Sequence, residues 1–336
     1  MNWNNEKAIV TGGNGFLGKR IVNSLIQKNC SSITAFCRKP SPELREMGIN
    51  VINGDIRDFS SLKSAFSHRT IIFHTAAKAE VWGEKEEFFK TNTMGTENVL
   101  RACRINEIPA LIYTSSPSVA YPCGKNIEKI NEDTPYPEKY LSFYPESKAA
   151  AEKIVLLQKE VPAVSLRPHL IWGPGDPHLL PRIVEQARKG KLMRIGDGNN
   201  MVDLTFVENA AHAHILAAEE LRNLHKCQGK AYFISDGIPV NLWNWINFFL
   251  NELGVQKIKK SVSYKTAFAM GLAFEKIYSV FNLRSEPPMT RFIASQLAHS
   301  HYFDISAAKH DFGYSPIIGE DEAIRKTVES FRMSSC

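Results

Sequence analysis

The sequence contains few of the features that mark an exported, disulfide-bonded or metal-binding protein. Residues 1–7 are polar, with no long apolar core and no small-residue cleavage site, so we expect a cytoplasmic protein. No spacing of His, Cys and carboxylate residues suggests a metal site. The cysteines lack paired spacing, which predicts free thiols in a reducing compartment. There are six of them: Cys30, Cys37, Cys103, Cys123, Cys227 and Cys336.

Long basic runs and membrane-spanning runs are also missing. The 336 residues carry 41 Lys and Arg against 35 Asp and Glu, a net charge of +6 that is spread along the chain. We therefore expect no nucleic-acid partner. The longest apolar stretch, 266–281, is interrupted by Glu275 and Lys276 and is too short to cross a bilayer. The length suits one large α/β domain with an appended lobe.

A glycine-rich segment follows the first expected strand, residues 7–10, and opens a helical pattern at 16–28. It reads Thr11-Gly12-Gly13-Asn14-Gly15-Phe16-Leu17-Gly18. Glycines at this spacing allow a tight turn, a close approach of the backbone to a pyrophosphate and close helix packing. The helix N-terminus adds unpaired N–H groups and partial positive charge. A simple tight turn is the alternative, but the context predicts dinucleotide contacts from Gly12, Gly15, Phe16, Leu17 and Gly18.

The rest of the first half alternates short β-branched runs with helical patterns. Further strands are expected at 32–36, 50–52, 70–73, 110–113 and 163–166, and helices at 86–106 and 144–160. This alternation predicts an α/β fold: a doubly wound, parallel Rossmann sheet with a smaller, mostly helical C-terminal lobe. We expect a nucleotide-binding domain over 1–172 with a return segment at 202–240. The substrate lobe would take 173–201 and 241–336.

The residues after the second strand bear on the choice of cofactor. An NAD enzyme usually carries an acidic residue about 20 positions beyond the glycines. Here the sequence is Phe36-Cys37-Arg38-Lys39-Pro40, without a carboxylate. Two cations suit a 2′-phosphate, because Arg offers a planar fork to phosphate oxygens. We therefore predict NADP(H) over NAD(H); in the alternative, Arg38 stacks on adenine and Lys39 is merely solvated.

Other cofactor contacts are expected at the ends of later strands. Asp55 and Ile56 follow the third strand, where the carboxylate either accepts from the adenine amino group or caps a helix. Thr75-Ala76-Ala77 follows the fourth strand, and the small side chains of Ala76 and Ala77 leave room for the cofactor backbone. Asn92, at the front of the long central helix, would steady the sheet or relay protons.

The segment Tyr144-Pro145-Glu146-Ser147-Lys148 puts a phenol and an ammonium four residues apart, on one helix face. A phenol has a pKa near 10, and a nearby ammonium favours the phenolate. Tyr144 can then exchange a proton with an alkoxide, while Lys148 bonds the nicotinamide ribose. A hydroxyl after the fifth strand would hold the substrate carbonyl. By position we favour Ser116, with Ser118 second, although turn formation explains either serine equally well.

Together these motifs resemble the extended short-chain dehydrogenase/reductases. The residues that carry the resemblance are Thr11–Gly18, a serine after the fifth strand, and Tyr144 with Lys148. Residues 112–116 and 166–177 are similar to the 3β-hydroxysteroid dehydrogenase branch. The resemblance implies further cofactor contacts from Thr114, Pro168 and Leu170. Pro117 and Ser118 stand where sugar-nucleotide dehydratases carry carboxylates, which counts against dehydration.

A narrower resemblance is to bacterial ketoreductases of long-chain olefin biosynthesis, in residues 114–119, 171–182, 229–235 and 311–314. It implies NADPH-dependent reduction of a long-chain 2-alkyl-3-oxoalkanoic acid to the 3-hydroxy acid. The alternatives are a 3β-hydroxysteroid dehydrogenase, a sugar-nucleotide epimerase and a non-catalytic NADP-binding protein. The broader resemblance to the short-chain family implies a homodimer through helices 86–106 and 144–160, and the narrower one implies a larger pathway complex.

Three interpretations remain for residues 266–281: a core helix, a lid over an apolar pocket for a lipid-like substrate, or a peripheral contact with a membrane. His212 and His214 lie two apart on a helix, so they face different directions and do not make a metal pair. His74 is expected to be structural.

Overall fold

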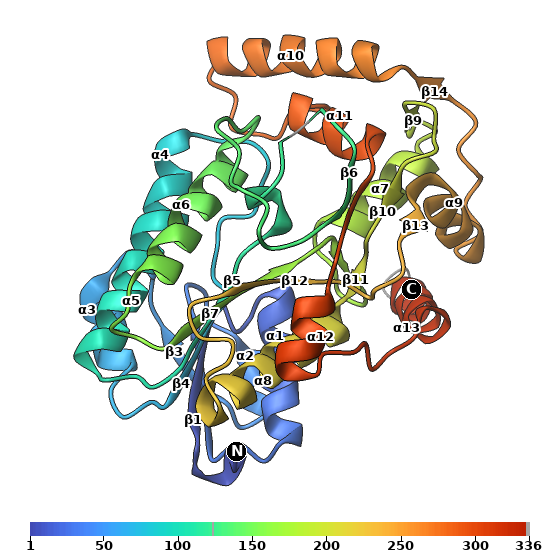
Figure 1. Ribbon diagram of the computed structural model, residues 1–336. Coiled ribbons are helices and arrows are strands. Elements are labelled where there is room, and N and C mark those ends of the chain that lie inside the picture. The colour runs from blue at the N-terminus through green and yellow to red at the C-terminus, as the bar shows by residue number, and fades with distance from the viewer. Residues whose placement is uncertain (123, 334–336) are drawn as a thin grey trace.

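The computed structural model describes residues 1–122 and 124–333, and its centre is a parallel sheet of seven strands. The strand order is β12-β7-β5-β4-β1-β2-β3, as expected for a doubly wound fold (Figure 1). The strands are β1 (Lys7–Thr11), β2 (Ser32–Cys37), β3 (Asn50–Asn53), β4 (Ile71–His74), β5 (Leu111–Thr114), β7 (Ala163–Pro168) and β12 (Ala231–Ile234).

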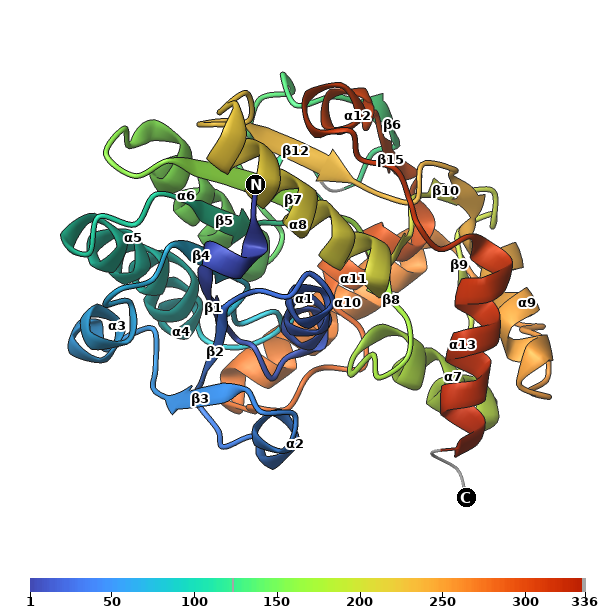
Figure 2. The same ribbon diagram turned by 90° about the horizontal axis from the view of Figure 1, so that it is seen from below.

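Helices cover both faces of this sheet, which explains why its strands are continuous apolar runs rather than alternating ones. One face is covered by α1 (Phe16–Gln27) and α8 (Val207–Asn223). The other face is covered by α3 (Phe59–Ala65), α5 (Gly95–Ile105) and α6 (Phe143–Leu157). Figure 2 shows the two layers of helices on either side of the strands. In β1, Ala8 and Val10 pack toward the first layer and Ile9 toward the second, all three fully buried.

The long central helix expected at 86–106 is interrupted. It consists of α4 (Lys85–Phe88), a π-helical segment η2 (Phe89–Met94) and α5. Within the π-helical segment, the Asn92 side chain accepts from the Lys78 N–H at 2.7 Å and donates to the Ser147 hydroxyl at 3.0 Å. Single π-helical turns concentrate at functional sites, and this one lies against the helix that carries Tyr144.

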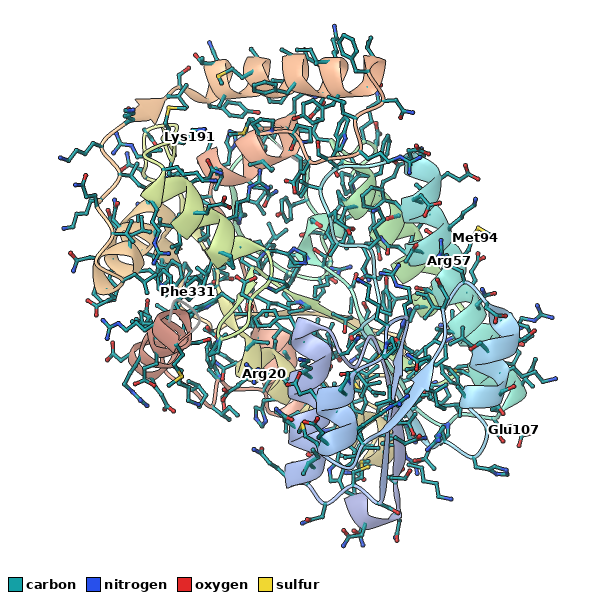
Figure 3. The ribbon with its side chains drawn as sticks, turned by 180° about the vertical axis from the view of Figure 1, so that it is seen from behind. Arg20, Arg57, Met94, Glu107, Lys191 and Phe331 are labelled. Atoms are coloured by element: carbon teal, nitrogen blue, oxygen red, sulfur yellow. The ribbon has the colours of Figure 1, made fainter. Side chains whose placement is uncertain are left out.

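The return segment at 202–240 supplies the last strand of the main sheet, because β12 pairs with β7. The start of this segment forms two short strands, β10 and β11, that belong to different sheets. Arg20 of α1 ties the nucleotide half to the loop after β8, since its Nη2 donates to the Pro174 carbonyl at 2.7 Å (Figure 3). The short strands here are β8 (Ile171–Trp172), β10 (Met201–Val202) and β11 (Thr205–Phe206).

Most of the remaining elements build the C-terminal lobe and a small mixed sheet of order β13-β10-β15-β6. Helix α12 (Ser306–Phe312) instead packs on β12 and α8 of the nucleotide-binding part, although the lobe expected from the sequence includes 241–336. The lobe has its own aromatic core, in which Trp172 packs edge-on against Trp245. The strands are β6 (Ile127–Ile130), β9 (Arg194–Ile195), β13 (Val240–Asn241), β14 (Ser261–Val262) and β15 (His301–Phe303). The helices are α7 (Leu179–Arg188), α9 (Leu242–Glu252), α10 (Tyr264–Val280), α11 (Arg291–Ala298), α12 (Ser306–Phe312) and α13 (Glu320–Met333). Short helices are η1 (Trp3–Asn5), α2 (Pro42–Glu46) and η3 (Pro117–Val119).

Helix α10 contains most of the apolar stretch 266–281, and the interpretation of that stretch as a core helix is wrong. Only Ala267 and Gly271 of α10 are buried. The helix lies on the outside of the lobe and packs on α11 (Figure 1). Gly271 permits this approach, because a Cβ there would lie 2.6 Å from the Arg291 nitrogen. Among the described residues, no helix is long and apolar enough to cross a membrane.

Four cysteines, Cys30, Cys37, Cys103 and Cys227, are free thiols, as predicted. The other two, Cys123 and Cys336, lie outside the described residues.

Candidate active site

The glycine-rich loop connects β1 to α1, and its geometry requires the glycines. Gly12 has a φ of +70°, a left-handed conformation that side-chain-bearing residues rarely adopt. A Cβ on Gly18 would lie 2.2 Å from the Gly12 carbonyl oxygen, and one on Gly15 would lie 3.0 Å from the same atom. The loop therefore folds back on itself so closely that only glycines fit, and the first turn of α1 opens onto the cavity beside it.

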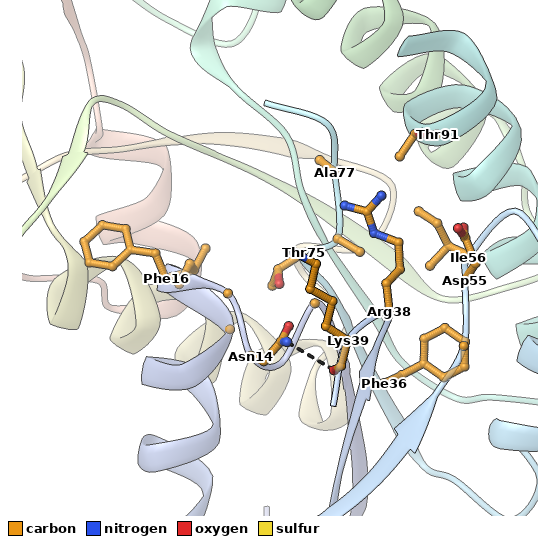
Figure 4. A pocket seen from close by; sticks show the side chains of 16 residues that line it. Asn14, Phe16, Phe36, Arg38, Lys39, Asp55, Ile56, Thr75, Ala77 and Thr91 are labelled. Atoms are coloured by element: carbon orange, nitrogen blue, oxygen red, sulfur yellow. Dashed lines mark hydrogen bonds between the residues drawn. The ribbon is translucent and has the colours of Figure 1, made fainter. Parts of the chain in front are cut away.

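This cavity is lined by eleven of the residues predicted to contact a dinucleotide (Figure 4). They are Gly12, Gly15, Phe16, Leu17, Gly18, Arg38, Lys39, Asp55, Ile56, Ala76 and Ala77. The structure adds Asn14, Phe36, Gly54, Thr75 and Thr91 to the lining.

Of these five added residues, Gly54 could have been predicted from the sequence and Thr91 could not. Gly54 follows the third strand, and a Cβ there would lie 2.4 Å from the Phe36 ring. A glycine directly after a strand is visible in the sequence, so it could have indicated this part of the cavity. Thr91 comes from the π-helical segment, which no pattern in the sequence predicts. Its place in the cavity depends on how that segment is wound.

Arg38 and Lys39 are exposed at the end of β2, and their side chains extend into the cavity (Figure 4). Among the described residues, neither forms an ion pair with a carboxylate. Asp55 has a different role from the predicted helix cap. It accepts three hydrogen bonds from Arg57, at 2.8 to 3.0 Å, whereas Asp58 caps α3. Burial by itself would raise the pKa of Asp55, but the bonds and charge of Arg57 hold it below its usual value.

Lys148 lies on α6 with its side chain almost completely buried. Its Nζ donates to the Thr114 carbonyl at 2.6 Å and lies 4.2 Å from the centre of the Tyr113 ring. Burial lowers the pKa of Lys148 from 10.5 to about 7, against the opposing charge of Glu152 one helical turn further on. The ammonium is therefore poorly stabilised by its surroundings and readily loses its proton.

Tyr144 is half-buried one turn before Lys148, and α6 begins with a cap from the Ser142 hydroxyl to the Tyr144 N–H. Burial raises the pKa of Tyr144, and a hydrogen bond with Ser116 opposes that rise. The expectation that Lys148 lowers this pKa is wrong for the structure as it stands, because the ammonium is directed at the Thr114 carbonyl. The phenol is accordingly a protonated acid at neutral pH.

Ser116 forms a side-chain hydrogen bond with Tyr144, and its role in holding the substrate carbonyl stays a prediction. It caps η3, and its Oγ lies 2.8 Å from the Oγ of Ser118, the second-choice residue. The turn-forming role of Ser116 is therefore confirmed, and its hydrogen bond with Tyr144 leaves the catalytic role open.

The remaining predicted cofactor residues do not line the glycine-loop cavity. Asn92 is buried and bonded to Lys78 and Ser147, so it joins the loop after β4 to α6. Thr114 and Pro168 end β5 and β7, where Thr114 Oγ1 lies 2.8 Å from His214 Nε2. Leu170 has a φ of +40°, an uncommon conformation for a branched side chain. For these residues, cofactor contact stays a prediction.

His74 is buried and hydrogen-bonded through both ring nitrogens, as expected for a structural residue. Its two ring nitrogens lie 2.7 Å from Thr11 Oγ1 and 3.0 Å from Thr96 Oγ1, so it links β1 to α5 through β4. Burial and the charge of Lys148 lower the pKa of His74 to about 3, which keeps the ring neutral.

One buried group beneath the site was missed. Glu152 accepts from Arg167 through Nε and, at 2.7 Å, through Nη2. It also accepts from the Ser165 and Tyr136 hydroxyls, each at 2.7 Å. The spacing of Lys148 and Glu152 on one helix was a usable signal, but the partners come from strand β7 and a distant loop.

The family model described as "3-beta hydroxysteroid dehydrogenase/isomerase family" matches residues 9–265, most of the chain. The chain belongs to this family. Two relatives named 2-alkyl-3-oxoalkanoate reductase are similar over 95% of the chain. The protein from Shewanella oneidensis is 43% identical, with 84% of its length covered. That from Stenotrophomonas maltophilia is 41% identical, with 98% covered.

A mouse protein named sterol-4-alpha-carboxylate 3-dehydrogenase, decarboxylating, is 33% identical over 97% of this chain and 91% of its own length. Among solved structures, MoeE5 in complex with UDP-glucose and NAD has a TM-score of 0.76 at 22% identity. The match covers 98% of this chain and 100% of that one. That likeness confirms the fold. As a member of the 3-beta hydroxysteroid dehydrogenase/isomerase family, the chain is an NAD(P)-dependent oxidoreductase of CH–OH groups.

Proposed function

We propose that this protein uses NADPH to reduce a long-chain 2-alkyl-3-oxoalkanoic acid to the 2-alkyl-3-hydroxyalkanoic acid. The observation that carries the proposal is the 43% and 41% identity to two proteins named for that substrate, in a chain that keeps Tyr144, Lys148 and Ser116 together. The substrate would lie between the nucleotide-binding part (1–172 with 202–240) and the lobe (173–201 and 241–336).

The chain's own residues supply the proton chemistry. The bound cofactor would supply hydride to the carbonyl carbon. Ser116 would donate a hydrogen bond to the carbonyl oxygen, and Tyr144 would transfer its phenolic proton to that oxygen as the alkoxide develops. Because burial raises the pKa of Tyr144, the resting phenol carries the proton that reduction requires. Lys148 would bond the ribose, and its charge would stabilise the phenolate left behind.

Preference for NADPH rests on Arg38 and Lys39. The cavity has two cations with no carboxylate partner among the described residues, and no acidic side chain ends β2. An arginine fork suits the 2′-phosphate that distinguishes NADPH from NADH. The test is kcat/KM with both cofactors for the wild type, Arg38→Ala, and Arg45→Ala as a nearby exposed control. Loss of a charge-assisted bond should lower the NADPH preference about 10- to 100-fold in Arg38→Ala alone.

The substrate class is tested in the oxidation direction, because 3-oxo acids decarboxylate readily. Purified protein is given NADP⁺ with a long-chain 2-alkyl-3-hydroxy acid, a 3β-hydroxysterol-4-carboxylate or UDP-glucose, and formation of NADPH is followed. We expect turnover of the hydroxy acid. The sterol acid is the second candidate, because the mouse relative is named for it. Turnover of the sterol acid alone would replace the proposed substrate, and turnover of none would refute the function.

A further inference from the structure

Helix α10 and the segments at its two ends form a surface that is both apolar and basic. In Figure 1 the helix lies at the top of the molecule, with α11 beneath it and the main sheet far away. We define the α10 surface as residues 255–286. The most exposed large apolar side chains of this surface are Val280, at 79% exposure, and Phe281, at 70%. Met270, Ile277 and Leu283 are exposed as well.

Three of the exposed apolar side chains lie along one side of the helix. Met270 and Ile277 are seven residues apart and Phe281 follows four later, so they lie along one stripe at the helical repeat. Ala267 and Gly271, which pack on α11, lie on the neighbouring face of the helix, about a quarter of a turn round from the stripe. A helix that needed only to be solvated would not present an apolar stripe outward at this length.

Unpaired cations surround this stripe. The α10 surface carries six exposed basic residues, and none of them forms an ion pair with a carboxylate in the described part of the chain. They are Lys257, Lys259, Lys260, Lys265, Lys276 and Arg284. Only two carboxylates lie in the same surface, and both are neutralised by arginines from outside it. Glu275 is paired with Arg291, and Glu286 with Arg182.

We propose that the α10 surface binds in the plane of an anionic lipid bilayer. Exposed apolar side chains flanked by lysines are the chemistry of an interfacial helix, in which apolar groups enter the headgroup region and cations pair with lipid phosphates. A second copy of this chain would bring the same six cations together, which disfavours a symmetric dimer through this surface. The charge of the surface therefore selects an anionic partner.

The placement would bring the active site to the lipid. The Trp82 indole N–H donates to the Leu283 carbonyl at 3.3 Å, and its ring meets the Tyr278 ring edge-on. Trp82 follows Val81, whose carbonyl accepts from Ser142, the cap of the helix that carries Tyr144. The C-terminal end of α10 is thus only two contacts from the catalytic helix. The lipid-binding proposal does not depend on which substrate the site takes.

The test is co-sedimentation of the whole protein with vesicles, without substrate. One set contains equal parts of phosphatidylcholine and phosphatidylglycerol, and the other phosphatidylcholine alone. We expect binding to the anionic vesicles that falls at high salt. Replacing Lys257, Lys259 and Lys260 with Gln should weaken it about 100-fold, at about 1 kcal/mol for each cation. The apolar pair Val280→Glu with Phe281→Glu should weaken it at least about tenfold.

Matched controls separate this surface from general effects. Lys63, Lys139 and Lys226, exposed elsewhere, are replaced with Gln, and Leu157 and Ile238, which are 76% and 75% exposed, with Glu. These variants should bind vesicles like the wild type. Thermal unfolding establishes that every variant is folded without any substrate, so a failed substrate assignment leaves this result unaffected.

Three outcomes would overturn the proposal. The wild type does not bind anionic vesicles, or it binds them equally well after both sets of α10 changes. In the third, the wild type is a dimer in solution that Val280→Glu with Phe281→Glu converts to monomers without any vesicle binding, in which case a second copy covers this surface.

Discussion

Burial of Lys148 should make this protein less stable than its Lys148→Met variant, by an amount that depends on pH. The pKa of Lys148 is about 7 in the folded chain, against 10.5 when the side chain is free in water. Folding therefore disfavours the charged form. At about 1.4 kcal/mol for each unit of pKa, the cost approaches 5 kcal/mol below pH 7, where the lysine is charged both folded and unfolded.

The cost disappears above pH 10.5, where both states are neutral, so it declines as the pH rises between the two values. Methionine removes it, but leaves the Thr114 carbonyl without its donor, which costs about 1 kcal/mol. The variant should thus be more stable by about 3–4 kcal/mol near pH 6 and by only about 1 kcal/mol near pH 9.

Urea unfolding of the cofactor-free protein at several pH values measures this difference. Lys153→Met serves as the control, because Lys153 is exposed on the same helix. Its effect on the free energy of unfolding should be small and flat with pH. If Lys148→Met were less stable than the wild type at pH 6, or if the difference did not shrink with rising pH, Lys148 would not be a destabilised cation.

Three further changes probe other parts of the site. Tyr144→Phe should reduce kcat by at least about 100-fold, the size of a general acid contribution. The Kd for NADPH, measured by fluorescence titration, should stay close to that of the wild type. Retained activity would show that Tyr144 does not donate the proton. Glu152→Gln should lower the free energy of unfolding in urea by about 3–5 kcal/mol, because it leaves the Arg167 guanidinium buried beside a neutral group. Glu160→Gln, in the exposed pair with Arg104, should lower it by less than about 1 kcal/mol. Equal losses would contradict the reasoning. Gly18→Ala should abolish NADPH binding in the same titration, since its Cβ would overlap the Gly12 carbonyl, whereas Gly319→Ala has open space and should bind normally.

The parts of the site that the sequence predicts are those built from neighbouring residues. Gly12 to Gly18 are required by a single turn, and Tyr144 and Lys148 share a helix face, so their geometry follows from spacing. Arg38 and Lys39 directly follow β2, so their position at a strand end also follows from the sequence. Parallel strands with known order then bring these separate segments to one edge of the sheet.

What the sequence did not predict depends on contacts between distant segments. The π-helical turn at Phe89–Met94 contains Asn92, which bonds to Lys78 and Ser147, and Thr91, which lines the cavity; no pattern in the sequence predicts that turn. Helix α10 has the composition of a core helix, and composition cannot show that α11 covers only one side of it. The environment of Tyr144 was misjudged because the direction of the Lys148 ammonium is set by the Thr114 carbonyl on β5.

The charges beneath the site explain how a raised phenol pKa and a catalytic proton transfer are compatible. Lys148, Glu152 and Arg167 are buried together, and when Lys148 is protonated they carry two positive charges and one negative. Burial is what lowers the pKa of Lys148 to about 7, and the negative charge of Glu152 opposes that shift. When Tyr144 gives up its proton, the phenolate supplies the missing negative charge within a helical turn. If Tyr144 is the proton donor, as proposed above, the site would be closer to electrostatic balance after proton transfer than before it, and an enzyme gains rate from such a difference.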